Sequence, residues 1–277
     1  MATQLLFYDN AVPVSFKRHA KTSVKTGDSY AFASKVNSVP LTASEFADAG
    51  AEYPIVFAGE GENVIPTAIL GVAGERNAFV SSDGVWGGRY IPAFVRRYPF
   101  VFGHQTEENQ LVLHIDETFE GVNQNDRGER LFDSDGNRTQ YLKNVLSFLQ
   151  DYQARFNRSR AYCKRLVDLD LLRPMQAQFT LPNGERRSLT GFMTVDREKL
   201  KALDSETLSQ MMATDELECT FLHLASLRHF AEIAEKSAGD GAGDDSALTF
   251  QSAKGGNGAI ADAAEAGEEA KASETAD

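Results

Sequence analysis

Cysteine is scarce in this chain of 277 residues, which has only Cys163 and Cys219, far apart and each within helix-like sequence. Small disulfide-stabilised domains are rich in cysteine, so the chain does not belong to that class. A free cysteine behaves mostly as a small apolar side chain. We therefore predict that both thiols fill space in the fold and that the protein works in a reducing compartment.

Basic residues are also in short supply, since 28 Lys and Arg stand against 40 Asp and Glu and give a net charge of -12. Proteins that bind nucleic acids gain affinity by neutralising many phosphates with clustered Lys and Arg. The composition therefore argues against a dedicated nucleic-acid binder. Residues 237–277 contain nine acidic and two basic residues, so they carry -7 of the total and the rest of the chain carries -5.

Long hydrophobic runs are missing as well. No run approaches the roughly 18 apolar residues that a membrane helix needs. The opening "MATQLLFYDNAVPVS" also lacks the charged segment and apolar core of a signal peptide. We expect a cytoplasmic protein without a membrane span, and export by a route that reads no N-terminal signal stays open.

The first part of the chain predicts a sheet. Hydrophobic residues make up 42% and charged residues 25%, which is ordinary for a globular fold with a substantial core. Up to residue 117, short apolar runs alternate with Gly, Pro and Asn, as is typical of strands joined by turns. The runs are YPIVFAG (53–59), AILGV (68–72), NAFVSS (77–82) and QLVLHID (110–116), and a short helix is expected between strands at 41–50.

Residues 138–236 are predicted to be rich in helix. Apolar residues recur every three or four positions over 140–166, and Thr139 stands where a helix N-cap is expected. The elements expected after this helix are a hairpin at 175–195 with an Asn183-Gly184 turn, short helices that begin near Asp196 and Asp204, and one long helix over 216–237 that buries Leu217, Phe221, Leu224, Leu227 and Ala231.

The predicted fold class is therefore α+β: a mostly antiparallel N-terminal sheet, then a helical region with an inserted hairpin. We expect one domain over residues 1–236, sheet-rich over 1–117 and helix-rich over 138–236. Residues 237–277 consist mainly of Gly, Ala, Asp, Glu and Ser. Such a composition cannot bury enough apolar area to offset its ordering entropy, so a disordered acidic tail is predicted there.

The strongest functional signal lies at residues 86–98, here called the 86–98 block. It combines the only tryptophan with three arginines and several aromatic rings. One interpretation is a core segment whose arginines are ion-paired at the surface. The other is a site for a carboxylate, phosphate or sugar, because guanidinium groups beside aromatic rings suit such ligands. Its candidate binding residues are Trp86, Arg89, Tyr90, Arg96, Arg97 and Tyr98.

A metal site has weaker support. His114 and Asp116 share one face of an expected strand and could begin a two-histidine, one-carboxylate iron site. The candidates for a second histidine are His223 and His229, which lie on different faces of an expected helix. We therefore expect no metal and no other cofactor, and we assign no catalytic residues.

Several stretches together resemble the SapC family of bacterial proteins, over nearly all of residues 5–237. They are YPIVF (53–57), WGGRYIPAFVRRYPFVF (86–102), LVLHIDE (111–117), GERLFDSDGNRTQYLKNVLSFLQ (128–150), LTGFMTVDREKLKAL (189–203) and LHLASL (222–227). The family takes its name from a surface-layer-associated protein. The resemblance implies a non-enzymatic accessory or structural role, with surface-layer or outer-membrane uptake components as partners.

Three functional hypotheses follow. The first is a non-enzymatic accessory or structural protein, which could form a homo-oligomer. The second is a protein that binds a small anionic or sugar-like ligand through the 86–98 block, as a binder or as an enzyme accessory in nutrient uptake or modification. The third is a non-haem iron oxygenase that uses His114 and Asp116.

Overall fold

The computed structural model describes residues 6–27, 29–72, 74–104, 111–180, 186–238 and 247–252. Their strands form antiparallel sheets, and helices follow and cover them, so the predicted α+β class is confirmed. No helix within these ranges is both long and apolar enough to cross a membrane.

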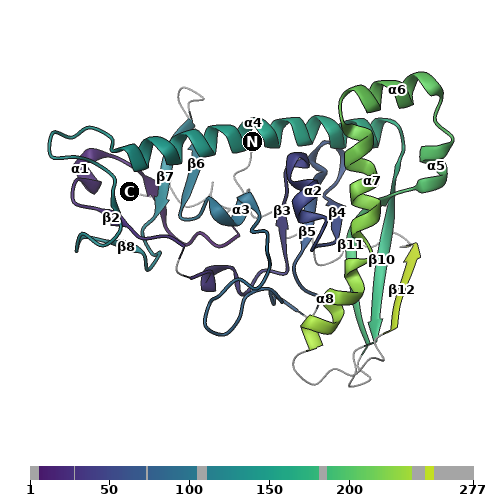
Figure 1. Ribbon diagram of the computed structural model, residues 1–277, viewed down its shortest axis with the longest axis horizontal. Helices are drawn as coiled ribbons and strands as arrows, with labels where there is room; N and C mark the ends of the chain where they lie inside the picture. Colours follow the sequence, from purple (N-terminus) through teal and green to yellow (C-terminus); the bar gives the residue numbers. More distant parts are fainter. Residues whose placement is uncertain are drawn as a thin grey trace, which may run out of the picture.

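The largest sheet lies at one end of the molecule (Figure 1). Its order is β12-β10-β11-β4-β5-β3, and every neighbouring pair is antiparallel. The bounds are β3 (Ser38–Pro40), β4 (Ile55–Ala58), β5 (Ile65–Ile69), β10 (Leu172–Thr180), β11 (Arg186–Val195) and β12 (Ala247–Ser252). The predicted hairpin is the β10–β11 pair, and its expected Asn183-Gly184 turn lies outside the described residues.

Two smaller sheets form the other end of the molecule. One has the order β1-β7-β6 and the other the order β8-β2-β9. Their bounds are β1 (Ala11–Pro13), β2 (Ser23–Val24), β6 (Phe100–His104), β7 (Leu111–Asp116), β8 (Val122–Asn123) and β9 (Glu129–Arg130). The short helix α1 (Phe16–His19) lies beside them (Figure 1).

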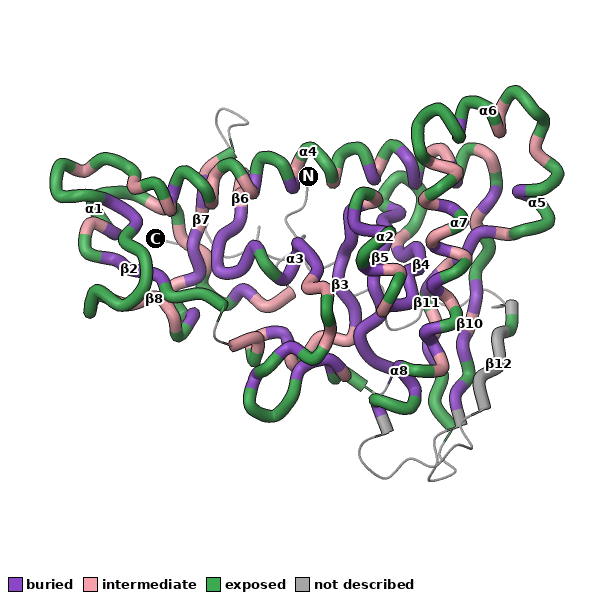
Figure 2. The backbone as a smooth tube through the Cα atoms, viewed as in Figure 1, coloured by how far each residue is buried: buried purple, intermediate pink, exposed green. Residues whose placement is uncertain are grey.

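The helix α4 (Gln140–Asp168) runs along the whole molecule and joins its two ends (Figure 1). It begins as predicted, because the Thr139 side chain accepts a hydrogen bond from the Leu142 amide at 3.3 Å. Its inner face is buried and its outer face is exposed (Figure 2). The other helices are α2 (Phe46–Ala49), α3 (Ala93–Arg96), α5 (Arg197–Lys201), α6 (Ser205–Ala213), α7 (Glu216–Ser226) and α8 (His229–Ala238).

The buried apolar side chains form two clusters. The larger packs between the six-stranded sheet and the helices, and the smaller lies under the β1-β7-β6 sheet. Helix α4 contributes side chains to both clusters: Leu142 and Leu149 belong to the smaller one and Leu166 to the larger one. Phe7 and Phe32 are half-buried and pack against both clusters, so they mark the junction between them.

The prediction of one long helix over 216–237 is wrong. The chain forms α7 and α8, separated at residues 227–228, although neither Gly nor Pro marks the break. The expected buried face is only partly correct: Leu217, Leu224 and Leu227 are half-buried and pack against the larger cluster, but Phe221 is 50% exposed. The fully buried side chains of α7 are nevertheless polar, and they are Thr220, His223 and Ser226.

His223 explains why a polar face is buried. Its Nε2 accepts from the Val195 amide at 3.1 Å, and its Nδ1 lies 2.7 Å from the Ile55 carbonyl. The β4–β11 pairing of Phe192 with Ala58 would place Val195 opposite Ile55 if the ladder continued. Instead the two strands separate and the imidazole bridges them, so buried backbone groups of both strands keep hydrogen-bond partners.

The predicted tail over 237–277 needs one correction. Residues 247–252 form β12, which pairs antiparallel with β10 at the edge of the large sheet. Within β12, residues 248–251 (LTFQ) alternate apolar and polar residues, which is typical of a strand sequence. Residue 237 belongs to α8, and the acidic residues beyond 252 lie outside the described ranges.

Candidate functional site

The six candidate residues of the 86–98 block do not form one surface. Trp86, Arg97 and Tyr98 are buried, Tyr90 is half-buried, and Arg89 and Arg96 are exposed. The block passes through α3, where residues 92–95 are buried in succession, and Arg89 and Arg96 are its exposed arginines. The structure therefore divides the predicted site into an inner part and an outer part.

Trp86 and Tyr90 are fixed by polar contacts inside the molecule. The indole Nε1 of Trp86 donates to the Tyr90 carbonyl at 3.1 Å and to the Tyr53 hydroxyl at 3.2 Å, and Tyr53 in turn donates to the same carbonyl. The Tyr90 hydroxyl donates to Glu45 Oε1 at 2.8 Å. These bonds occupy the polar atoms that a ligand would need.

Two carboxylates from an earlier part of the chain, Glu45 and Glu52, accept hydrogen bonds from the 86–98 block and fix its conformation. Glu45 Oε1 accepts from the Ala93 amide at 2.7 Å, and its Oε2 accepts from Thr42 in a capping box that begins the helical turn before α2. Glu52 accepts from the Arg89 amide at 2.8 Å and from Arg89 Nε at 3.0 Å. The Arg89 side chain is otherwise 91% exposed.

The Glu52 carboxyl is tuned by this arrangement. Burial raises its pKa, but the N–H groups of Tyr90 and Arg89 that point at the carboxylate outweigh that effect, so the pKa lies below its ordinary value. The charged form therefore persists at neutral pH and keeps the start of the block in place.

Arg97 is enclosed by aromatic rings of the protein itself. Its guanidinium carbon lies 4.0 Å from the Phe94 ring centroid, 5.3 Å from that of Tyr152 and 5.7 Å from that of Tyr8. Burial raises the pKa of Tyr8 to about 12, although the charge of Arg97 beside it acts in the opposite direction. This arginine therefore serves the core as a cation over π faces.

Arg96 faces the solvent. Its Nε donates to the Ile91 carbonyl at 2.9 Å, and its guanidinium lies 5.6 Å from the ring centroid of Phe148 and 5.8 Å from that of Tyr90. Among the arginines of the block, only Arg89 and Arg96 remain able to meet a molecule from solvent.

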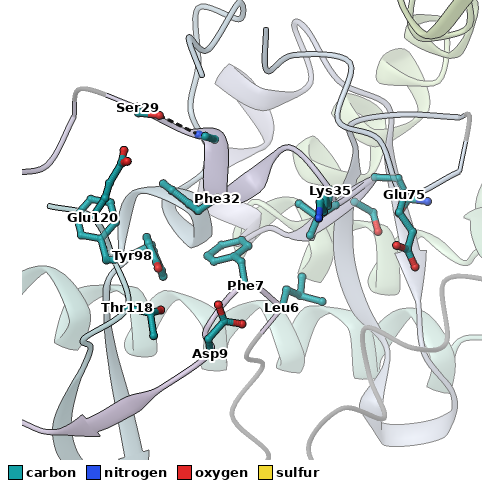
Figure 3. Close-up of a pocket in the computed structure, with 15 residues that line it drawn as sticks. Leu6, Phe7, Asp9, Ser29, Phe32, Lys35, Glu75, Tyr98, Thr118 and Glu120 are labelled. Carbon is teal, nitrogen blue, oxygen red and sulfur yellow. Dashed lines mark hydrogen bonds between the residues drawn. The ribbon is translucent and has the colours of Figure 1, made fainter. Parts of the chain in front are cut away.

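A cavity of about 670 Å³ lies against the block at Tyr98 (Figure 3). We call it the junction cavity, because it opens beside Phe7 and Phe32 where the two apolar clusters meet. Ligand sites favour such boundaries between packed units. Its described lining is Leu6, Phe7, Asp9, Ser29, Ala31, Phe32, Lys35, Val36, Asn37, Ser38, Glu75, Tyr98, Thr118, Phe119 and Glu120.

One wall of the junction cavity is aromatic. The rings of Phe32 and Tyr98 are stacked with centroids 4.2 Å apart (Figure 3). Phe7 meets Tyr98 edge to face at 5.4 Å, and Phe119 meets it at 5.1 Å. The four rings come from separate segments of the chain and form one aromatic cluster, in which Phe7 and Phe32 are half-buried and Tyr98 and Phe119 are buried behind them.

The rim of the cavity is polar and mostly acidic. Asp9, Glu75 and Glu120 are exposed there, together with Lys35 (Figure 3). Ser29, Asn37 and Thr118 add uncharged donors and acceptors. Three carboxylates against one ammonium among the described lining residues give a negative rim, which opposes the approach of an anion.

Asp116, the carboxylate of the weakly supported iron-site hypothesis, accepts hydrogen bonds from residues that line the cavity. It is buried and accepts from the Asp9 amide at 2.8 Å, from the Thr118 hydroxyl at 2.7 Å and from the Tyr98 hydroxyl at 3.3 Å. All three donor residues line the junction cavity. Burial alone would raise the pKa of Asp116. The hydrogen bonds from Thr118 and from the Asp9 amide outweigh burial, so the pKa lies below its ordinary value.

His114 is held in the sheet. Its Nδ1 lies 2.9 Å from the Val112 carbonyl, and its ring packs on Gly103 of β6 so closely that a Cβ there would stand 2.6 Å from it. Within the described ranges, no three His, Cys, Asp or Glu side chains gather as metal ligands. The predicted His114 and Asp116 pair is therefore not extended to a ligand set by the described residues.

Sequence reasoning located Tyr98 but missed the other rings of the cavity. Phe32 lies in the 3-10 helix Ala31–Ala33, whereas Phe7 and Phe119 lie in turns and bends, and the three share no spacing. No local signal links them, because the rings meet through contacts between residues 25 to 91 positions apart.

Comparison with known proteins adds one match. The family model described as SapC matches residues 14–233, which include the 86–98 block, α4 and most of the cavity lining. Leu6, Phe7 and Asp9 precede the matched region. No curated protein and no solved structure matches the chain.

Proposed function

Because the chain belongs to the SapC family, we propose that it is a non-enzymatic accessory protein and that its task is to bind a small sugar-like ligand in the junction cavity. The observation that carries the proposal is the stacked wall of Phe32 and Tyr98 beneath an acidic and hydroxyl-rich rim. The accessory role would place it beside surface-layer or outer-membrane uptake components of a bacterium, as a single chain or a homo-oligomer.

The aromatic wall supports this class of ligand. A sugar ring presents C–H groups on its faces and hydroxyl groups around its edge. The faces can pack on the rings of Phe32 and Phe7, which are only half-buried. A cavity of about 670 Å³ lies within the range of small-molecule sites.

The rim supports a neutral ligand over an anionic one. Carboxylates accept hydrogen bonds and sugar hydroxyls donate them, so Asp9 and Glu120 are suitable partners for a polyol. A phosphate or carboxylate ligand would meet the same groups as like charges. Of the two ligand classes that the block predicted, the sugar-like class is the one we propose.

The test is a binding screen by ligand-observed NMR with neutral monosaccharides and disaccharides, and with hexuronic acids as anionic members. We expect at least one neutral sugar to bind. Asp9→Asn and Glu120→Gln should each weaken binding about five- to tenfold, as loss of a hydrogen bond to a charged group does. Glu235→Gln, at an exposed position on α8, is the matched control and should leave binding unchanged.

Two outcomes would contradict the junction cavity as a sugar site. One is the absence of binding by every neutral sugar at millimolar concentration to the folded protein. The other is binding that Asp9→Asn and Glu120→Gln do not weaken, because the ligand would then lie elsewhere. Preference for the hexuronic acids would keep the cavity and reject the neutral class.

A further inference from the structure

A second cavity, independent of the junction cavity, lies between the first turns of α4 and the β1-β7-β6 sheet. It measures about 450 Å³, and we call it the α4 groove. Leu142 and Leu146 lie one turn apart on α4 and form one side of it. Phe102 of β6 and Leu111 of β7 contribute to the rest of its lining, as does Phe16 of α1.

The apolar lining of the groove is open to solvent. Phe16 is 45% exposed and Leu111 is 44% exposed, and they belong to the small set of large apolar side chains that the described residues leave exposed. Both line the same cavity although they come from different elements. Exposed apolar side chains that gather at one hollow mark a binding surface more often than scattered ones do.

Arg138 is the one charged residue among the described lining of the groove. It immediately precedes Thr139, the N-cap of α4, so its guanidinium and the positive end of a helix of 29 residues lie at the same end of the groove. Within the part of the chain that the structure describes, the Arg138 side chain makes no hydrogen bond or ion pair. The groove therefore combines an apolar wall with an available cation.

This combination fits an amphiphile with a single anionic head group. Leu146 lies seven residues beyond Thr139, which corresponds to about 10 Å of helix, so the apolar wall extends away from the arginine in one direction. We propose that the α4 groove binds a medium-chain fatty acid, with its carboxylate on Arg138 and its acyl chain along Leu142 and Leu146. Arginine recognises carboxylates with two parallel hydrogen bonds, and burial of each CH₂ group adds affinity.

The charge part of the proposal is tested by calorimetric titration of the full chain with decanoate and with 1-decanol, both below the concentrations at which they aggregate. Decanoate should bind at one site and more tightly than the alcohol. Arg138→Gln should weaken decanoate binding about tenfold and leave the alcohol unchanged. Arg158→Gln, at an exposed position on the same helix, is the control and should change neither.

The apolar part is tested by Leu111→Glu, which places a charge in the path of the acyl chain at a position that is already partly exposed. This variant should bind both decanoate and 1-decanol at least tenfold more weakly. Met212→Glu on α6, where the side chain is 66% exposed, is the matched control. Thermal unfolding of each variant verifies that it remains folded.

The proposal is overturned if decanoate shows no saturable binding to the folded protein, or if Arg138→Gln binds decanoate as tightly as the natural chain does. Binding of several molecules per chain that neither Arg138→Gln nor Leu111→Glu weakens would indicate surface adsorption and would also overturn it. None of these results bears on sugar binding, because the two cavities share no lining residue.

Discussion

The hydroxyl of Tyr98 donates a hydrogen bond of 3.3 Å to Oδ2 of Asp116, which is buried at the end of β7. The same carboxylate accepts from Asp9 and Thr118, so one side chain fixes three segments that surround the junction cavity. Burial of the charged Asp116 side chain requires these donors, because a buried carboxylate without hydrogen-bond partners would destabilise the fold.

Asp116→Asn should lower the free energy of unfolding by about 2–3 kcal/mol. The substitution replaces one carboxylate oxygen by an NH₂ group, which cannot accept a hydrogen bond from the N–H and O–H groups around it. Urea denaturation monitored by tryptophan fluorescence measures this loss. Asp126→Asn, at an exposed position, is the control and should cost less than about 1 kcal/mol. Equal stability of the two variants would mean that Asp116 does not organise the cavity.

Arg96 and Arg97 should behave differently, although they are neighbours in the sequence. Arg97→Ala should lower the free energy of unfolding by about 2–3 kcal/mol, since it empties a buried position and removes a cation from three ring faces. Arg96→Ala should cost less than about 1 kcal/mol, because this side chain is exposed. Similar costs for both variants, measured in urea, would contradict the inner and outer division of the 86–98 block.

Acidification should weaken the fold through His223. Burial lowers the pKa of His223 to about 4, although its bond to the Ile55 carbonyl acts in the opposite direction. The unfolded chain has an ordinary histidine pKa of about 6.5, so between these values the unfolded state binds more protons. Stability is therefore full above the higher value and falls as the pH drops towards 4, by about 2 kcal/mol between pH 7.5 and pH 5.

Urea midpoints at pH 7.5 and pH 5 measure this dependence. Burial also lowers the pKa of His19, which contributes in the same direction, so a variant is needed to separate the two. His223→Gln cannot titrate in this range and should show a clearly flatter pH dependence, from a lower starting stability. A slope equal to that of the natural chain would remove His223 as its source.

The two cysteines should react with a thiol reagent at different stages. Cys163 is fully buried, and burial raises its pKa above the ordinary value. Cys219 is half-buried, and burial together with the charge of Glu218 raises its pKa to about 11. Titration of the native protein with a coloured disulfide reagent at pH 8 should modify Cys219 slowly and Cys163 only after unfolding. Fast modification of both thiols in the native state would contradict the packing.

Local patterns in the sequence predicted the elements that local rules control. The periodicity of α4, the Thr139 cap and the β10–β11 alternation are contained in short windows, and each was predicted correctly. The break between α7 and α8 was not, because the apolar spacing continues across it. The inward turn of His223 also depends on strands more than 25 residues away.

The candidate site was only partly predictable for the same reason. The composition of the 86–98 block identified it as unusual, but the partners that settle its conformation are Glu45 and Glu52, in an earlier part of the chain. Whether an arginine faces a ligand or a ring is decided by such contacts. The block could therefore be located from the sequence, whereas the roles of Arg96 and Arg97 could not be separated.

One helix takes part in both apolar clusters, and this determines how the molecule loses its structure. If the β1-β7-β6 end came apart alone, Leu142 and Leu149 would be exposed on a helix whose other half was still packed through Leu166. Helix formation is cooperative, so each half stabilises the other. We expect the two ends to melt together, in a single calorimetric transition whose measured enthalpy equals its van't Hoff enthalpy.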